Sequence, residues 1–148
     1  MIELDRSGDR VRDVWVFDVD GCLIDAMSGR SLRPLAAELF EVLAERGVRI
    51  VLWSAGGADY ARRKAAGVGI AARVEAFYEK GARDADGRWT TAHFASAHRS
   101  ATFVDDLPAE APREPRLIGV SPYIGENAHD RGLARALEIA RADAAAPA

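Results

Sequence analysis

Two pairs of aspartates each follow a short apolar run of the chain. Asp18 and Asp20 come after the run VWVF, and Asp105 and Asp106 come after the run ATFV. An ionised carboxylate beside buried chain is costly unless it is paired, and several carboxylates in one crevice repel one another. A divalent cation would offset this repulsion, and ligands that are all oxygen favour Mg²⁺. Because Mg²⁺ also accepts phosphate oxygens, the acids predict a site for a phosphorylated substrate.

A serine at the end of another apolar run supplies groups that suit an anion. Ser54 follows the run IVLW and precedes the turn Ala55-Gly56-Gly57, which leads into a predicted helix. The serine hydroxyl and the backbone N–H groups of the three turn residues are donors, and the positive end of the helix dipole adds to them. We therefore expect this turn to bind phosphate.

A cation that balances phosphate charge is the remaining requirement, and the sequence contains two lysines. Lys64 follows two arginines in the middle of a predicted helix and is expected to face the solvent. Lys80 lies in a loop-like segment ahead of the apolar run at 101–104. Lys80 is therefore the candidate for the phosphate-binding lysine.

The apolar pattern predicts the elements that position these residues. Runs at 14–17, 50–53, 101–104 and 117–120 are short and do not alternate with polar residues, which is typical of strands buried in a parallel sheet. Helices are predicted at 34–45, 58–66, 71–77, 90–98 and 130–145. This alternation predicts an α/β fold with a doubly wound, mostly parallel Rossmann-like sheet and helices on both faces. The residues that follow the strands should then meet at one edge of the sheet.

The composition is that of a globular protein. We expect residues 1–148 to form a single domain, with 49% hydrophobic and 29% charged residues. The formal net charge of -3 does not indicate binding to nucleic acid, and the apolar runs are far shorter than the ~20 residues of a membrane helix. The single cysteine, Cys22, excludes an intrachain disulfide, and the charged N-terminal segment is unlike a signal peptide. These features predict a soluble, cytoplasmic protein.

Four segments, taken in order, resemble the motifs of the haloacid dehalogenase (HAD) superfamily of phosphohydrolases. They are FDVDGCLID, VLWSAGG, the lysine at position 80 and FVDD, and they span Asp18 to Asp106. The superfamily has a strand ending in DxD, a strand ending in Ser or Thr, a lysine, and a strand ending in paired acids. Cys22 is a departure, since the family usually has Thr or Val at that place, but its bulk is similar.

The resemblance implies a role for each of these residues. Asp18 would be the nucleophile that takes the phosphoryl group as an aspartyl-phosphate, and Asp20 would be the general acid and then the base for water. The metal ligands would be Asp18, Asp20 through its backbone carbonyl, Asp105 and Asp106. The phosphate would be held by Ser54, Ala55, Gly56 and Lys80. Because Asp20 is an acid, the resemblance implies a Mg²⁺-dependent phosphatase of phosphate monoesters rather than an ATPase or a dehalogenase.

Many members of the superfamily carry a cap domain, for which this chain has little room. Residues 24–48 can hold a flap hairpin and one helix, and residues 77–99 can hold one short helix or hairpin. The resemblance therefore implies a member without a large cap. An open site of this kind suits large substrates, or a homo-oligomer in which a neighbouring copy covers the site. Residues expected to line the entrance are Arg30, Arg33 and Tyr123.

Other functions fit parts of the pattern. Glycosyltransferases with a DxD motif need a nucleotide-binding domain ahead of it, and a short segment precedes Asp18. A receiver domain gathers acids, a hydroxyl group and a lysine around Mg²⁺, but its paired acids come first and its lysine last. A non-catalytic HAD-like or receiver-like module that binds phosphate and Mg²⁺ for regulation remains the alternative. The sequence does not identify the phosphorylated partner, whether a small molecule or a macromolecule.

Each candidate residue also has a simpler interpretation. Asp20 and the glycine after it suit a turn at a strand end, Ser54 suits a helix cap, and Asp106 suits a turn. Lys80 and the entrance residues would then be ordinary surface residues, and Cys22 a small core residue. For the acids, the serine and the lysine we prefer the functional interpretation, because they occur together and in order. For Cys22 and the entrance residues we prefer the simpler one.

Overall fold

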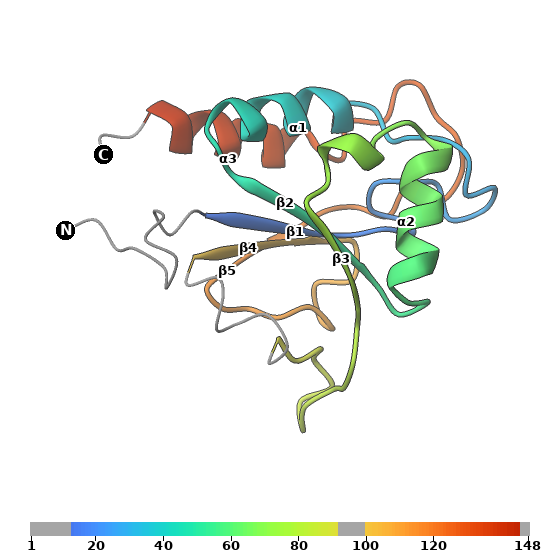
Figure 1. Ribbon diagram of the computed structural model, residues 1–148, viewed down its shortest axis with the longest axis vertical. Coiled ribbons are helices and arrows are strands. Elements are labelled where there is room, and N and C mark those ends of the chain that lie inside the picture. Colours follow the sequence, from blue (N-terminus) through green and yellow to red (C-terminus); the bar gives the residue numbers. More distant parts are fainter. Residues whose placement is uncertain (1–12, 92–99, 146–148) are drawn as a thin grey trace.

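A five-stranded parallel sheet forms the centre of the computed structural model, which describes residues 13–91 and 100–145. The strands are β1 Val14–Asp18, β2 Arg49–Ser54, β3 Ala76–Glu79, β4 Ala101–Asp105 and β5 Arg116–Gly119. Their order in the sheet is β3-β2-β1-β4-β5, and every neighbouring pair is parallel (Figure 1). The predicted doubly wound, Rossmann-like α/β fold is thereby confirmed.

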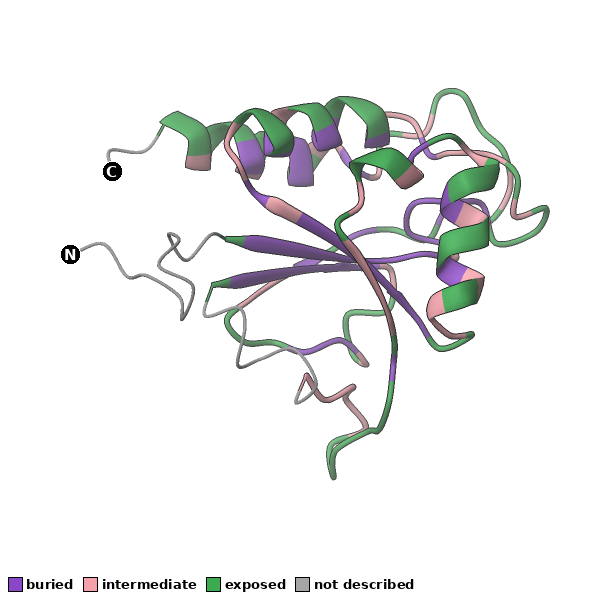
Figure 2. Cartoon of the chain, viewed as in Figure 1, coloured by how far each residue is buried: buried purple, intermediate pink, exposed green. Residues whose placement is uncertain are grey.

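Alternate residues of the central strands belong to the two faces of the sheet. In β1, Trp15 and Phe17 lie on one face, Val14 and Val16 lie on the other, and all four are buried. The strands β2 and β4 divide in the same way, and Figure 2 shows all three strands buried along most of their length. Burial on both faces explains why these runs are apolar without alternation.

The α-helices found in the described residues share one face of the sheet. They are α1 Ala36–Glu45, α2 Ala58–Gly67 and α3 Ala134–Ala145, and their buried residues form one core with Trp15 and Phe17. The helices α1 and α3 pack side by side, whereas α2 lies beside β2 and β3 (Figure 1). These helices agree with three of the predicted ones and differ from them by a few residues at the ends.

Helices were predicted on both faces of the sheet, and the prediction for the opposite face depends on a segment that lies mostly outside the described residues. Val16, Trp53 and Phe103 are buried on this face, where the half-buried Trp89 packs against them. No helix within residues 13–91 and 100–145 covers this face. The helix predicted at 90–98 falls almost entirely on residues 92–99, which lie outside the described residues.

The segment at 71–77 was predicted to be a helix, and this prediction is wrong. A single 3₁₀ turn, Ala71–Arg73, is followed by the edge strand β3, whose register pairs Ala76 with Val51 of β2. The backbone partners that β2 offers outweigh the weak helical pattern of so short a segment. As a result, Lys80 directly follows a strand and is held at its carboxyl end.

The chain that leaves β1 folds into a small hairpin. An antiparallel bridge between Ile24 and Leu32 closes it, and residues 25–31 are called the flap below. This hairpin agrees with the one expected within residues 24–48, and the described part of the chain contains no large cap domain. Among the same residues, no helix has both the length and the apolar character needed to cross a membrane.

Candidate functional site

The carboxyl ends of β1 and β4 lie side by side at the point where the strand order reverses. Ligands of doubly wound sheets bind at such a point, because the connections that leave the two strands diverge to opposite faces. Asp18 is the last residue of β1, and Asp105 is the last residue of β4. Ser54 ends the adjacent strand β2, and Lys80 follows β3. The fold therefore brings the predicted acids, serine and lysine to one edge.

Three aspartates form a cluster at this edge. Carboxylate oxygens of Asp18, Asp105 and Asp106 all lie within 4.8 Å of one another. Asp18 and Asp105 are buried, and Oδ1 of Asp106 is buried without a hydrogen-bond partner in the described structure. Buried oxygens at this separation, one of them without a partner, fit a divalent cation with oxygen ligands such as Mg²⁺.

Crowding in the cluster makes two of its acids weaker than usual. Burial, and then the charge of Asp18, raise the pKa of Asp105 to about 6. Burial and the neighbouring Asp18 carboxyl group raise the pKa of Asp106 to about 7. A cation bound among the three carboxylates would favour their ionised forms, so metal binding and proton release are coupled at this site.

Lys80 contacts two members of the cluster. Its Nζ lies 2.8 Å from Oδ1 of Asp18 and 3.5 Å from Oδ2 of Asp105, and the residue is buried. Nζ is also 5.3 Å from the ring centre of Trp53 and 5.6 Å from that of Trp89. Burial alone would lower the pKa of Lys80, but the charges of Asp18 and Asp105 raise it. Lys80 is therefore held in its charged form beside Asp18 and Asp105.

Asp20 is held by a tyrosine that the sequence analysis did not single out. The Tyr60 hydroxyl donates to Oδ2 of Asp20 at 2.7 Å. Burial, and then the Asp20 carboxylate, raise the pKa of Tyr60 to about 12, so the hydroxyl keeps its proton. A Cβ at Gly56 would lie 3.0 Å from the Tyr60 ring, so the missing side chain at Gly56 leaves room for this ring. Tyr60 comes from α2 and fixes where the Asp20 carboxyl group points.

The turn after Ser54 uses two of its predicted phosphate donors internally. The Gly56 N–H donates to Oγ of Ser54 at 3.0 Å, and the Gly57 N–H donates to the Ser54 carbonyl at 3.2 Å. The expectation that these two N–H groups are free to bind phosphate is therefore wrong for this structure. Because Oγ of Ser54 accepts one bond, its own proton remains available to an anion. The Ala55 N–H is the donor of this turn that has no acceptor among the described residues.

Gly21 allows Asp106 to approach the loop after β1. The φ angle of Gly21 is +76°, and a Cβ at this residue would lie 2.5 Å from Oδ2 of Asp106. The next residue, Cys22, is fully buried, and its thiol lies 3.5 Å from the Val104 carbonyl oxygen. Burial, and then the nearby aspartates, raise the pKa of the Cys22 thiol. Cys22 is therefore a core residue.

Two of the three residues predicted at the entrance are buried instead. Arg33 is 1% exposed and pairs with Asp130 at 2.7 Å, because the loop before α3 folds over its side chain. Tyr123 is 2% exposed, and its hydroxyl contacts Oγ of Ser31 at 3.0 Å and accepts from the Asn127 N–H at 3.1 Å. The prediction is therefore wrong for Arg33 and Tyr123, which are structural. Arg30 is exposed, as the prediction requires.

Asp25 is the second residue that the sequence analysis missed. Its buried carboxylate accepts hydrogen bonds from the Ser28 N–H at 2.6 Å, the Ser28 hydroxyl at 2.7 Å and the Ser31 N–H at 2.9 Å. The bonds from Ser28 hold the pKa of Asp25 well below its usual range. An aspartate three residues ahead of Ser28-Gly29 is a turn signal that could have identified this anchor of the flap.

Comparisons with known proteins extend the description of the fold. No family model and no curated protein matches the sequence. An uncharacterized protein from Listeria monocytogenes serotype 4b has a similar structure, with a TM-score of 0.56 and 14% identity over 88% of this chain and 99% of that one. A hypothetical protein from Xanthomonas campestris gives a TM-score of 0.49 and 17% identity, covering 87% of this chain and 82% of that one. The first likeness supports the fold alone.

Proposed function

We propose that this protein is a Mg²⁺-dependent phosphatase of the HAD type, which hydrolyses phosphate monoesters through an aspartyl-phosphate on Asp18. The observation that carries the proposal is the contact of Lys80 with Asp18 and Asp105, next to the unpartnered oxygen of Asp106. The nucleophile Asp18, at the end of a strand, then has two kinds of neighbour. One is the buried ammonium group of Lys80, and the other is the pair of carboxylates that would bind a metal ion with it. The proposal includes a cytoplasmic location, which the unpaired Cys22 supports.

The first half of the reaction transfers the phosphoryl group to the protein. An Asp18 oxygen attacks phosphorus and forms an O–P bond, while the bond from phosphorus to the leaving oxygen breaks. Asp20 gives its proton to the leaving oxygen, so the alcohol departs neutral. Lys80 and the Ser54 hydroxyl hold the phosphoryl oxygens through charge and hydrogen bonding during this step.

The second half returns the protein to its starting state. Water attacks phosphorus, and the Asp20 carboxylate takes the proton that the water loses. The bond between phosphorus and Asp18 breaks, inorganic phosphate leaves, and the Asp18 carboxylate is restored. The hydrogen bond from Tyr60 keeps Asp20 in position for both proton transfers.

The residues that would hold Mg²⁺ are Asp18, Asp105 and Asp106, together with the backbone carbonyl of Asp20. Bound Mg²⁺ supplies the positive charge that offsets repulsion between an anionic nucleophile and an anionic phosphate.

An assay with an aryl phosphate tests the proposal. We expect the purified protein to hydrolyse p-nitrophenyl phosphate with Mg²⁺, and Asp18→Asn to lose activity by about a thousandfold or more. The control is Asp59→Asn, which changes an exposed acid that pairs with Arg62 and should leave activity unchanged. Circular dichroism and the melting temperature establish that Asp18→Asn remains folded.

Two outcomes of this assay contradict the proposal. Equal turnover by Asp18→Asn shows that Asp18 is not the nucleophile. Mg²⁺-dependent phosphate binding by the unchanged protein, with no turnover of a broad panel of esters, favours the non-catalytic regulatory module instead.

A further inference from the structure

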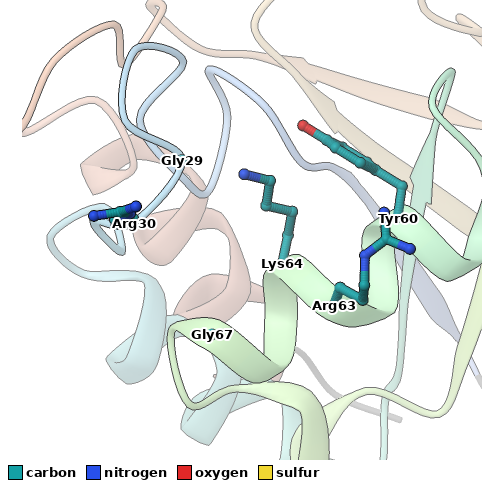
Figure 3. Close-up of a pocket in the computed structure, with 6 residues that line it drawn as sticks. All are labelled: Gly29, Arg30, Tyr60, Arg63, Lys64 and Gly67. Atoms are coloured by element: carbon teal, nitrogen blue, oxygen red, sulfur yellow. The ribbon is translucent and has the colours of Figure 1, made fainter.

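A pocket lies between the flap and α2, with Tyr60 in its lining. Its volume is about 380 Å³, and Figure 3 shows its lining residues, which are Gly29, Arg30, Tyr60, Arg63, Lys64 and Gly67. The α2 residues follow helical spacing, so they share one side of the helix and face the flap. The sequence analysis expected Lys64 to face the solvent, whereas the structure has it half-buried at this pocket. This basic pocket is distinct from the aspartate cluster.

The flap is shaped to accept the lysine of α2. Gly29 has a φ angle of +67°, and a Cβ at this residue would overlap Nζ of Lys64. Figure 3 shows the Lys64 side chain extending from α2 toward the flap at Gly29. Asp25 holds the flap in this conformation through the hydrogen bonds described above. The position of the Lys64 ammonium group is therefore set by two separate elements.

The pocket is lined by three positively charged side chains that have no ion-pair partner within the described residues. Within residues 13–91 and 100–145, no acid forms an ion pair with Arg30, Arg63 or Lys64. By contrast, Arg62 on the same helix pairs with Asp59 at 2.9 Å. Like charges around one cavity repel each other, and an anion bound between them would remove the repulsion. The charge pattern therefore points to an anionic ligand.

Tyr60 connects the basic pocket with the aspartate cluster. Its hydroxyl binds Asp20, and Nζ of Lys64 lies 5.5 Å from the centre of its ring. One aromatic side chain thus separates the acid that would protonate the leaving oxygen from the lysine of the pocket. An anion in the pocket would belong to the part of the substrate on the leaving-group side.

We propose that the basic pocket binds a second phosphate group of the substrate, so that the substrate class is a small molecule with two phosphates, of which one is hydrolysed. This inference rests on the proposed phosphatase function. A pocket of about 380 Å³ beside Lys64 suits one phosphate group rather than a long polyanion, and the net charge of -3 also disfavours a polynucleotide. The unhydrolysed phosphate orients the leaving group beside Asp20.

The test compares esters that differ in the second phosphate alone. Alkanediol bisphosphates of increasing chain length are assayed against the matching hydroxyalkyl monophosphates. We expect kcat/KM to favour one chain length of the bisphosphates by roughly tenfold to a hundredfold, and Lys64→Gln with Arg63→Gln to abolish this preference. The same double variant should retain its turnover of p-nitrophenyl phosphate. Arg62→Gln is the matched control, because it removes a paired charge from the same helix.

A second measurement separates failure of this inference from failure of the proposed function. Calorimetry with a non-hydrolysable alkane bisphosphonate reports binding even if no ester is turned over. Bisphosphonate binding that weakens roughly tenfold or more in the double variant supports the pocket, whatever the activity. Hydrolysis of esters without any advantage for a bisphosphate, and binding unchanged in the double variant, overturn it. Better turnover of a terminally phosphorylated oligonucleotide than of every bisphosphate assigns the pocket to nucleic acid and also overturns it.

Discussion

The two lysines of this chain lie in opposite electrostatic surroundings. Lys80 is buried between Trp53 and Trp89, and Asp18 and Asp105 balance its charge. Lys64 lies on the side of α2 that faces the flap, with two arginines nearby and no paired acid among the described residues. Lys80 therefore faces the carboxylates of the aspartate cluster, whereas Lys64 has no such partner within the described residues. In the two proposals above, this difference separates the site of chemistry from the site of recognition.

Replacing each lysine in turn is the strongest test of this comparison. Lys80→Gln removes the positive charge beside Asp18, so we expect kcat/KM to fall about a hundredfold or more for every phosphate ester. Lys64→Gln should reduce kcat/KM for bisphosphates and leave monophosphates unchanged. Steady-state kinetics with both ester classes measure the two effects. Equal losses in both variants for both classes would remove the distinction between the two sites.

A pair of glycine substitutions tests the geometry of the aspartate cluster. Gly21→Ala places a methyl group 2.5 Å from Asp106, so we expect the Mg²⁺ concentration for half-maximal activity to rise roughly tenfold. Gly47→Ala is the matched control, because Gly47 has a similar φ of +73° and nothing within 4 Å of the added Cβ. Both variants should lose stability from backbone strain, by about 1 kcal/mol. Titration of activity with Mg²⁺ should distinguish them, and equal Mg²⁺ requirements would contradict the role of Asp106.

Tyr60 lies between the two sites, and Tyr60→Phe tests which of them depends on its hydroxyl. The variant keeps the ring under Lys64 and loses the bond to Asp20, so we expect a loss of roughly threefold to tenfold in kcat/KM. The loss should be largest for esters with poor leaving groups, because the leaving oxygen of these esters requires the proton that Asp20 would give. A leaving-group series measures it, and a uniform loss would mean that Tyr60 does not act through Asp20.

The smallest expected effect concerns the flap that forms one wall of the basic pocket. Because the folded state lowers the pKa of Asp25 below its unfolded value, the ionised carboxylate stabilises the protein above about pH 4. This stabilisation decreases as the pH falls below that value, because the unfolded chain takes up the proton first, and it is lost once the pH falls through the lower folded pKa. We expect Asp25→Asn to lower the melting temperature at neutral pH and to have less effect at pH ~3. A constant difference across this range would show that the charge is not what holds the flap.

Much of the candidate site at the edge of the sheet could be predicted, because its residues follow strands directly. In a parallel sheet the ends of the strands meet, so the order of short apolar runs sufficed to place Asp18, Ser54 and Asp105 together. The strand before Lys80 was missed because an edge strand has a half-buried, mixed pattern. Its lysine was nevertheless identified, from charge balance rather than from structure.

The positions of the residues around the flap and the basic pocket were less predictable, because they depend on how loops fold. Arg33 was expected at the surface because arginines are usually exposed. Its partner Asp130 lies far along the chain, so this ion pair becomes visible only in the folded structure. Lys64 was expected in solvent because a helix position alone does not reveal that a flap covers it. Gly29 is informative only once its approach to Lys64 is known.

The flap and the loop before α3 are joined by hydrogen bonds, and this should couple their motions. The flap donates two backbone hydrogen bonds to the loop before α3, from Ala26 to Tyr123 at 3.0 Å and from Met27 to Ile124 at 2.8 Å. Just after the flap, the buried Arg33 pairs with the half-buried Asp130 of the same loop. Native-state hydrogen exchange should therefore detect the amides of both segments opening as one cooperative unit. A ligand bound at the flap would slow exchange in a loop that it never touches.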